Sequence, residues 1–248
     1  MMIKLTRGET PEFLTMEKTE ELTEKFKSSG ASVWNNSNIK IPLLRSSYGK
    51  CAYCECSLTT ESNYMEVEHF EDKKHNPEKV VKWDNLLPSC KKCNGAKGSH
   101  DVNNEPIVNP YLDDPREHIA LRLYRFRGKT SIGERTIDVT NLNHSERLVF
   151  SRFLIGEKIS ELINIAWERF ELYQIKKDSK TRNRLLGVIE GLLKECQKSA
   201  AYAASSATIL LTDYKFIELV QAMKSSLVWN EDLETLLVSA KDMIFECI

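Results

Sequence analysis

The stretch YMEVEHFEDKK, residues 64–74, decides the fold, because an alternating, strand-like run ends there on Glu68 and His69. Side chains of a strand alternate between its two faces, so Glu66 and Glu68 share one face. CAYC (51–54) precedes this stretch and WDNLLPSCKKCNGAK (83–97) follows it. The three stretches together predict a small site built from a strand, a loop and two pairs of cysteines.

The two cysteine pairs have the spacing of metal knuckles. In a CxxC sequence a tight turn aims both thiolates at one ion, and zinc takes four such soft ligands in a tetrahedron. Structural zinc is worth roughly 10–16 kcal/mol in finger-like peptides, which exceeds the total stability of many small domains. We therefore predict a structural zinc ion held by Cys51, Cys54, Cys90 and Cys93. The alternative is that the two pairs are buried cysteines with this spacing by chance.

Three of the seven cysteines lie outside the two pairs, and one of them, Cys56, could replace a zinc ligand. Cys56 offers a third thiol beside the first knuckle, and we interpret it as a small core residue or a free thiol. Cys196 and Cys247 lie in helical sequence and are predicted to be packing residues.

The composition is that of an ordinary globular protein, with 41% hydrophobic and 29% charged residues among 248. No apolar run approaches the length of a membrane helix, and the first residues lack the apolar core of a signal peptide. We therefore expect a cytoplasmic protein. The net charge of −1 disfavours a protein that grips a long nucleic acid unaided.

Apolar periodicity divides the chain at residues 143 and 144. The region 1–143 is predicted to contain a helix that begins after Thr15 and stops at Gly30, and then the segment rich in Cys and His. A hairpin is predicted over residues 118–140, with its turn between Gly128 and Gly133. The region 144–248 has helical spacing throughout and no proline, which predicts a helical bundle.

The order of these motifs resembles the HNH endonuclease family over residues 48–100: CxxC, an acidic residue before His, Asn-Leu-Leu, then CxxC-Asn-x-x-Lys. The resemblance implies a ββα-metal fold, in which two strands and a helix grip one divalent cation and zinc braces the structure. The expected fold class is therefore α+β: a zinc-braced ββα-metal (HNH) nuclease core with a β-hairpin and a C-terminal helical bundle.

The resemblance also implies roles for single residues. His69 matches the general base that acts on the attacking water, and Glu68 matches the acidic metal ligand beside it. Asn85 matches the residue that orders the loop, and Asn94 the position that holds the metal. Lys97 matches a helix lysine that meets phosphate.

The chemistry supports these residue types independently. Phosphodiester hydrolysis needs a water deprotonated near neutral pH, which suits histidine. A divalent cation stabilises the charge that develops on the phosphoryl oxygens. Magnesium or manganese would find oxygen ligands in Glu68 and Asn94, with Glu66 as an alternative or supporting ligand. Taken singly, each of these residues has a structural or surface role as its alternative.

Two basic stretches are candidates for nucleic-acid binding. Lys91 and Lys92 project from the second knuckle. In RLYRFRGK (122–129), alternation places Arg125 and Arg127 on one face of a strand, where they can guide phosphates. A solvated surface is the alternative in both cases.

A wider similarity covers the start MIKLTRGETPEFL, the spacing to the first knuckle and the run from EHF to NGAKG. These features resemble the PtuB-type HNH subunits of Septu antiphage systems and of some retron systems. The resemblance implies a PtuA-type ATPase partner and, in a retron, a reverse transcriptase with its RNA–DNA. The sequence has no GxxxxGK[ST] loop, so ATP control must come from a partner. We interpret residues 144–248 as the docking region, with simple packing as the alternative.

The predicted function is a metal-dependent HNH endonuclease, a toxic effector subunit of an antiphage complex, that hydrolyses phosphodiester bonds. DNA is the favoured substrate, and RNA such as tRNA is the other candidate. The alternative is a catalytically dead zinc-ribbon protein that binds nucleic acid or serves in assembly.

Overall fold

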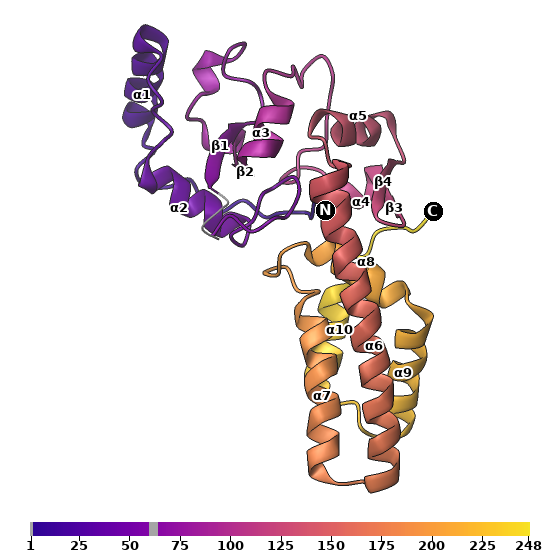
Figure 1. Cartoon of the computed structure of the whole chain (residues 1–248). Helices are drawn as coiled ribbons and strands as arrows, with labels where there is room; N and C mark the ends of the chain where they lie inside the picture. The colour runs from indigo at the N-terminus through magenta and orange to yellow at the C-terminus, as the bar shows by residue number, and fades with distance from the viewer. Residues whose placement is uncertain (1, 60–63) are drawn as a thin grey trace. The chain divides into compact units, whose positions relative to one another are not determined.

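Two compact units make up the chain in the computed structural model, which describes residues 2–59 and 64–248 (Figure 1). The first unit holds the chain up to Ala120 together with Phe126–Asn143, and the second holds Leu121–Arg125 together with His144–Ile248. The division passes through the tip of one hairpin. The continuous part of the second unit starts at residue 144, where the sequence predicts the helical region to start.

Figure 1 shows the helices and strands in chain order, and the described residues form them as follows: α1 (Met16–Ser29), α2 (Ser37–Ser46), β1 (Met65–His69), β2 (Leu86–Cys90), α3 (Lys91–Lys97), α4 (Pro115–His118), β3 (Ile119–Arg122), β4 (Arg125–Gly128), α5 (Ser131–Val139), α6 (Phe150–Lys176), α7 (Ser179–Lys194), α8 (Ala203–Thr212), α9 (Tyr214–Ser225) and α10 (Glu231–Lys241). The fold class is α+β, as predicted.

Strands β1 and β2 and helix α3 form the ββα centre of the first unit. The strands pair antiparallel, with Met65 opposite Cys90 and His69 opposite Leu86. Helix α3 follows β2 directly and packs on both strands. Val67 joins a buried apolar cluster that also contains residues of α1 and α2. Alternation along β1 therefore turns Glu66 and Glu68 away from that cluster, toward the side where α3 contacts the strands.

The ends of α1 lie where the sequence predicts them. The Thr15 side chain accepts a hydrogen bond from the Lys18 N–H at 3.1 Å, which satisfies one of the free donors of the first turn. Gly30 adopts a left-handed conformation, φ 67°, and its N–H donates to the Phe26 carbonyl. That conformation suits glycine because it has no Cβ, so the helix stops there.

The predicted hairpin over 118–140 is wrong in its second half. Strands β3 and β4 do pair, but they turn at Leu123 and Tyr124 instead of between Gly128 and Gly133. Residues 131–139 form helix α5, because Thr130 caps it by accepting the Gly133 N–H at 3.2 Å. The run ERTIDV (134–139) looks strand-like, but the buried residues of α5, Gly133, Thr136 and Ile137, have the three- and four-residue spacing of one helix face.

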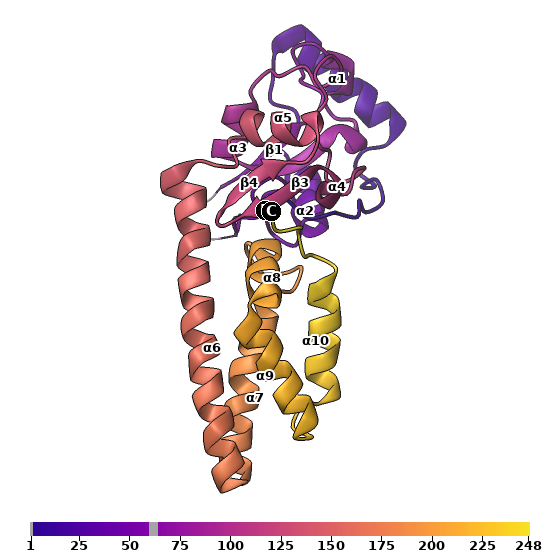
Figure 2. The ribbon, with the colours of Figure 1, turned by 90° about the vertical axis from the view of Figure 1, so that its right-hand side faces the viewer.

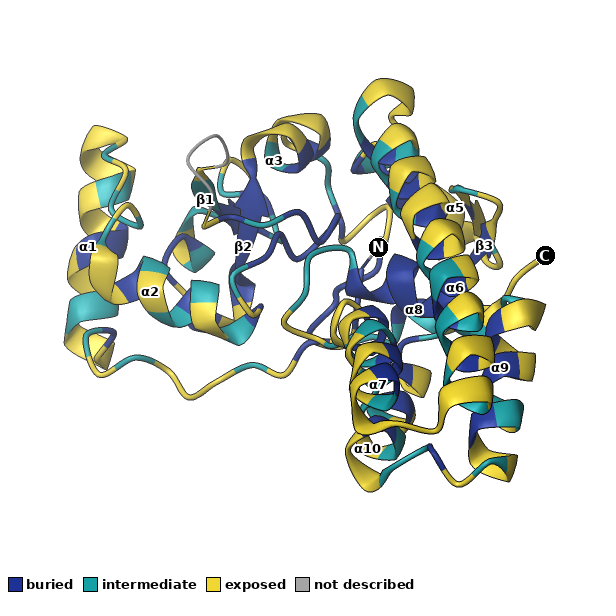
Figure 3. Ribbon diagram, turned by 60° about the horizontal axis from the view of Figure 1, so that its bottom comes forward, coloured by how far each residue is buried: buried dark blue, intermediate teal, exposed yellow. Residues whose placement is uncertain are grey.

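The second unit is a helical bundle, which confirms the prediction for this region. Helix α6 packs against α7, α8 and α9, and α10 packs against α7 and α8. Figures 1 and 2 show α6 and α7 as an antiparallel pair joined by a short connection. Figure 3 shows a buried and an exposed side on the helices of this unit. Among the described residues, no helix combines the length and the apolar character needed to cross a membrane.

The two cysteines of this unit differ in environment. Cys196 is fully buried, and burial raises the pKa of its thiol to about 12, which agrees with a packing role. Cys247 is exposed, so the prediction of a packing role for it is wrong. It lies after α10, in a terminal segment whose Glu246 carbonyl accepts the Leu121 N–H at 2.8 Å.

Gly133 is required where α5 approaches the carbonyl of His118. A Cβ at this position would lie 1.9 Å from that backbone oxygen. We predict that Gly133→Ala destabilises the protein by about 1–3 kcal/mol, because the backbone must shift. The matched control is Gly187→Ala in α7, where no atom lies within 4 Å of the added Cβ. Denaturant unfolding is the measurement, and equal stability of the two variants would contradict this account.

Candidate active site and metal centres

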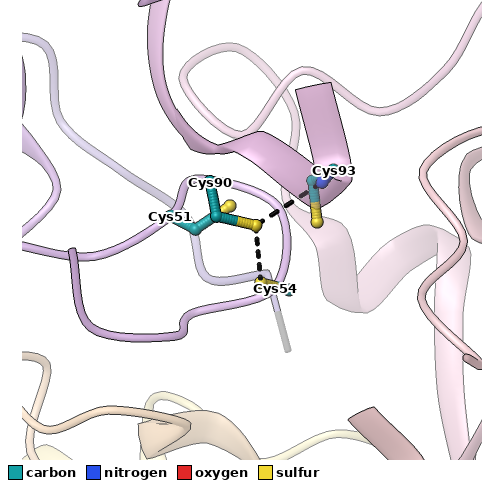
Figure 4. A group of neighbouring side chains, drawn as sticks. All are labelled: Cys51, Cys54, Cys90 and Cys93. Atoms are coloured by element: carbon teal, nitrogen blue, oxygen red, sulfur yellow. Dashed lines mark hydrogen bonds between the residues drawn. The ribbon is translucent and has the colours of Figure 1, made fainter. Parts of the chain in front are cut away.

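Four thiols meet at one point of the first unit. The sulfur atoms of Cys51, Cys54, Cys90 and Cys93 all lie within 4.8 Å of one another, and all four residues are buried. Figure 4 shows the four side chains converging, with contacts from Cys90 to Cys54 and to Cys93. Both CxxC pairs therefore contribute to the same cluster, as the sequence predicts.

The geometry of this cluster fits a zinc ion. Two ligands of a tetrahedral ion with zinc–sulfur bonds of about 2.3 Å are about 3.8 Å apart. The Cys54 and Cys90 sulfurs are 3.8 Å apart, far beyond the length of a disulfide bond. Neighbouring thiols also hold the pKa of Cys54 and of Cys90 below the usual range. Burial raises the pKa of the Cys51 thiol and neighbouring thiols raise that of Cys93, so the four groups share their protons unequally; the thiolate is the form that binds metal.

Local structure supports each knuckle. Cys90 precedes α3 and accepts the Cys93 N–H at 3.5 Å, so the second knuckle is the first turn of a helix. Beside the first knuckle, Lys50 and Glu55 form a buried ion pair at 2.6 Å. Cys56 is buried but stands outside the group of four, in keeping with its interpretation as a core residue or free thiol.

His69 ends β1 and is only 4% exposed. Its Nε2 lies 2.9 Å from the Val80 carbonyl oxygen, which can only accept, so Nε2 carries the proton and Nδ1 is the basic atom. The ring meets Trp34 edge to face, with centroids 4.7 Å apart. Burial lowers the pKa of His69 to about 4, so the imidazole is neutral at neutral pH and able to accept a proton.

Asn85 fixes the loop that supplies the Val80 carbonyl. Its Oδ1 accepts the Glu71 N–H at 2.7 Å. Its Nδ2 donates to the carbonyls of Glu71 and Lys79 at 3.0 and 3.1 Å. The side chain is buried, so these bonds are made out of water and tie the loop after β1 to the start of β2.

Glu68 and Lys97 form a buried ion pair between β1 and α3. The Lys97 Nζ lies 2.7 Å from a Glu68 oxygen and also donates to the His69 carbonyl at 2.9 Å. Burial raises the pKa of Glu68 to about 7, while the ammonium opposes that shift. Tyr53, from the first knuckle, is buried close enough for the Glu68 carboxylate to help raise the pKa of its hydroxyl. The cysteine cluster and the β1–α3 contact thus share one polar interior.

Glu66 and Asn94 lie on the accessible side of the same β1–α3 contact. The Asn94 Nδ2 donates to a Glu66 oxygen at 2.8 Å. Both residues line two cavities, of about 310 and 470 Å³. Trp34 and Lys40 are among the other residues of the smaller cavity, and Lys73 lines both. A carboxylate, an amide oxygen and open space are what a hard divalent cation requires, so this side of the contact fits one.

Sequence reasoning missed two residues of this neighbourhood. Lys73 lines both cavities, and its Nζ lies 5.2 Å from the centre of the Trp34 ring. The spacing of Lys73, four residues after His69, was the available signal for it. Trp34 comes from the connection before α2, and nothing in the sequence places it beside β1.

The predicted basic residues are distributed unevenly. Lys91 and Lys92 are exposed at the start of α3, and Lys91 lines the larger cavity. Arg125 and Arg127 are exposed on β4, while Phe126 between them is buried, as alternation predicts. Neither arginine lines the two cavities beside Asn94.

The cysteine cluster predicts a specific response to mutation. We expect one zinc ion per chain, lost in Cys90→Ser together with the fold of the first unit, because the ion then lacks one of its four ligands and no longer joins the two knuckles. Cys56→Ser is the matched control, since this buried thiol is a neighbour of the cluster without belonging to it. Elemental analysis and circular dichroism measure both properties. Full zinc retention and normal folding in Cys90→Ser would contradict the site.

Comparison with known proteins agrees with this geometry. Residues 51–100 match the HNH endonuclease family. The Septu protein PtuB of Bacillus thuringiensis is 42% identical over 97% of this chain and 94% of its own length. The Septu protein PtuB of Bacillus mycoides (strain KBAB4) is 30% identical over 46% of this chain and 49% of its own.

The HNH match covers the two knuckles, both strands and α3, and so includes the ββα centre with its buried histidine. The first of the two relatives aligns over nearly the whole chain, helical unit included. This chain therefore belongs to the PtuB family of Septu proteins and is an HNH endonuclease.

Proposed function

We propose that the chain is the nuclease subunit of a Septu antiphage complex and that it hydrolyses phosphodiester bonds with a catalytic magnesium or manganese ion. The observation that carries the proposal is His69: a neutral, oriented imidazole whose ring packs on Trp34, and Trp34 lines the same cavity as Glu66, Lys73 and Asn94. DNA is the substrate we favour from the family resemblance, and tRNA is the alternative to test beside it.

In this proposal His69 removes a proton from the attacking water. The Nε2–H of His69 donates to the Val80 carbonyl, which leaves Nδ1 to act as the base. Asn85 keeps that carbonyl in place by bracing the loop. General base catalysis contributes typically about 10²–10⁴-fold, so it accounts for part of the acceleration only.

The divalent cation belongs between β1 and α3, where Asn94 and the acidic residues of β1 supply oxygen atoms. When bound, such an ion supplies positive charge that stabilises the phosphoryl oxygens. The sequence resemblance gives the acidic ligand role to Glu68, and that assignment stays a prediction.

Basic side chains position the nucleic acid in this proposal. Lys73 and Lys91 line the cavities, and Lys92 is exposed beside them, so all three can meet backbone phosphate. Lys97 was predicted to do the same, but its side chain is buried on Glu68, which favours a bracing role. Arg125 and Arg127 remain candidate phosphate contacts outside the cavities.

Partners complete the proposal. The relatives are named as Septu proteins, and the resemblance implies a PtuA-type ATPase, with a retron reverse transcriptase and its RNA–DNA as a wider partner. The absence of a GxxxxGK[ST] loop in this sequence supports ATP control from another chain. The helical unit is our candidate for docking that ATPase.

The direct test is cleavage of plasmid DNA and of total tRNA with magnesium or manganese. We predict that His69→Ala lowers the rate by about 10²–10⁴-fold, because the base is lost, and that a chelator abolishes cleavage. His75→Ala is the matched control, since this exposed histidine on the same loop should leave the rate unchanged. No cleavage of either substrate, even with the ATPase present, would favour a nucleic-acid-binding or assembly subunit instead.

The second test concerns the partner. We predict weak cleavage by the isolated chain and a change in rate when the ATPase is purified with it, because the near-neutral charge gives little unaided grip on long nucleic acid. Equal and strong cleavage with and without the ATPase would contradict control by the partner.

A further inference from the structure

Two carboxylates of β1 face α3, and they differ in burial and in the groups they contact. Glu66 and Glu68 are two residues apart and therefore on one face of the strand. Glu68 is 2% exposed, whereas Glu66 is half-buried and borders both cavities. Sequence position alone does not separate their roles, but their surroundings do.

Glu68 already has a cationic partner. The Lys97 side chain is completely buried, and its ammonium lies 2.7 Å from Glu68 and 2.9 Å from the His69 carbonyl. A second cation on Glu68 would have to share this carboxylate with the ammonium, or displace it. A displaced ammonium would stay buried without its counter-charge, which is strongly unfavourable.

Glu66 has a different partner, the amide of Asn94. The Glu66 oxygen and the Asn94 Nδ2 are 2.8 Å apart. The amide oxygen and nitrogen are nearly equal in shape, so rotation of the amide brings Oδ1 to the place of Nδ2. Two neighbouring ligands of an octahedral magnesium ion, with bonds of about 2.0–2.1 Å, are about 2.9 Å apart. The pair is thus already spaced as adjacent ligands.

We infer that Glu66, together with Asn94, supplies the protein oxygens that hold the catalytic divalent cation, and that Glu68 is a positioning residue. The Glu68–Lys97 pair fixes β1 on α3 and holds the His69 carbonyl, so it aligns the strand from which both Glu66 and His69 project. This inference rests on the proposed function, because it names the metal ligand of that same site.

Trp34 makes metal binding measurable without cleavage. Terbium is a hard, oxygen-seeking ion, and a nearby indole transfers excitation energy to it. Trp34 lines the same cavity as Glu66 and Asn94. Terbium titration of the zinc-loaded full chain, followed by release with magnesium, therefore reports on this site. Trp34→Phe should remove the sensitised emission and so assign the signal to this cavity.

The deciding comparison is Glu66→Gln against Glu68→Gln. We expect Glu66→Gln to weaken terbium binding about tenfold or more and to leave the melting temperature unchanged. We expect Glu68→Gln to lower the melting temperature, because Lys97 loses its counter-charge, and to change the terbium affinity less than about threefold. Glu20→Gln, on the exposed side of α1, controls for the loss of one surface carboxylate.

The reverse pattern, with binding lost in Glu68→Gln and kept in Glu66→Gln, would overturn the inference. If Glu68→Gln does not fold, the double variant Glu68→Gln/Lys97→Gln removes both buried charges, and retained binding there supports Glu66. These results do not depend on cleavage. A protein that binds terbium through Glu66 but cuts no nucleic acid would refute the proposed function and leave the metal site intact.

Discussion

The four-thiol cluster is the contact on which the first unit depends. Cys51 and Cys54 lie before β1, and Cys90 and Cys93 lie at the junction of β2 with α3. One ion at the cluster therefore closes the chain around both strands and fixes the start of the helix. A pair of five-residue strands and a seven-residue helix bury too little apolar surface to hold such a geometry alone. A metal ion bound by the four thiols would supply the missing constraint.

Buried polar contacts connect the cysteine cluster to His69, the proposed general base. Tyr53 lies within the first knuckle, beside Glu68, and Glu68 pairs with Lys97, which in turn holds the His69 carbonyl. On the other side, Asn85 fixes the loop whose Val80 carbonyl orients the imidazole. Each of these groups is costly to bury unpaired, so the arrangement is specific as well as stable. Thiolate ligands select zinc and oxygen ligands select magnesium or manganese, so a site of each kind could coexist in this unit without exchanging metals.

The sequence predicts well what depends on local spacing. The two CxxC turns, the strand ending on His69, the caps of α1 and the helical character of the second unit follow from short-range patterns. The sequence predicts poorly the features that depend on contacts between residues far apart in the chain. Alternation puts Glu66 and Glu68 on one face, but Lys97 of α3 determines which of them is buried. Burial of Lys97, the approach of Trp34 and the helical state of residues 131–139 depend likewise on tertiary contacts.

The central claim is that this nuclease keeps two metals at two sites of opposite chemistry. Anomalous diffraction at the zinc and manganese edges, from one crystal grown with manganese, tests it most directly. The account predicts a zinc peak among the four cysteine sulfurs and a separate manganese peak beside Asn94, on the side of β1 that carries its carboxylates. A manganese peak at the cysteines, or none near Asn94 in a crystal that contains the ion, would contradict it.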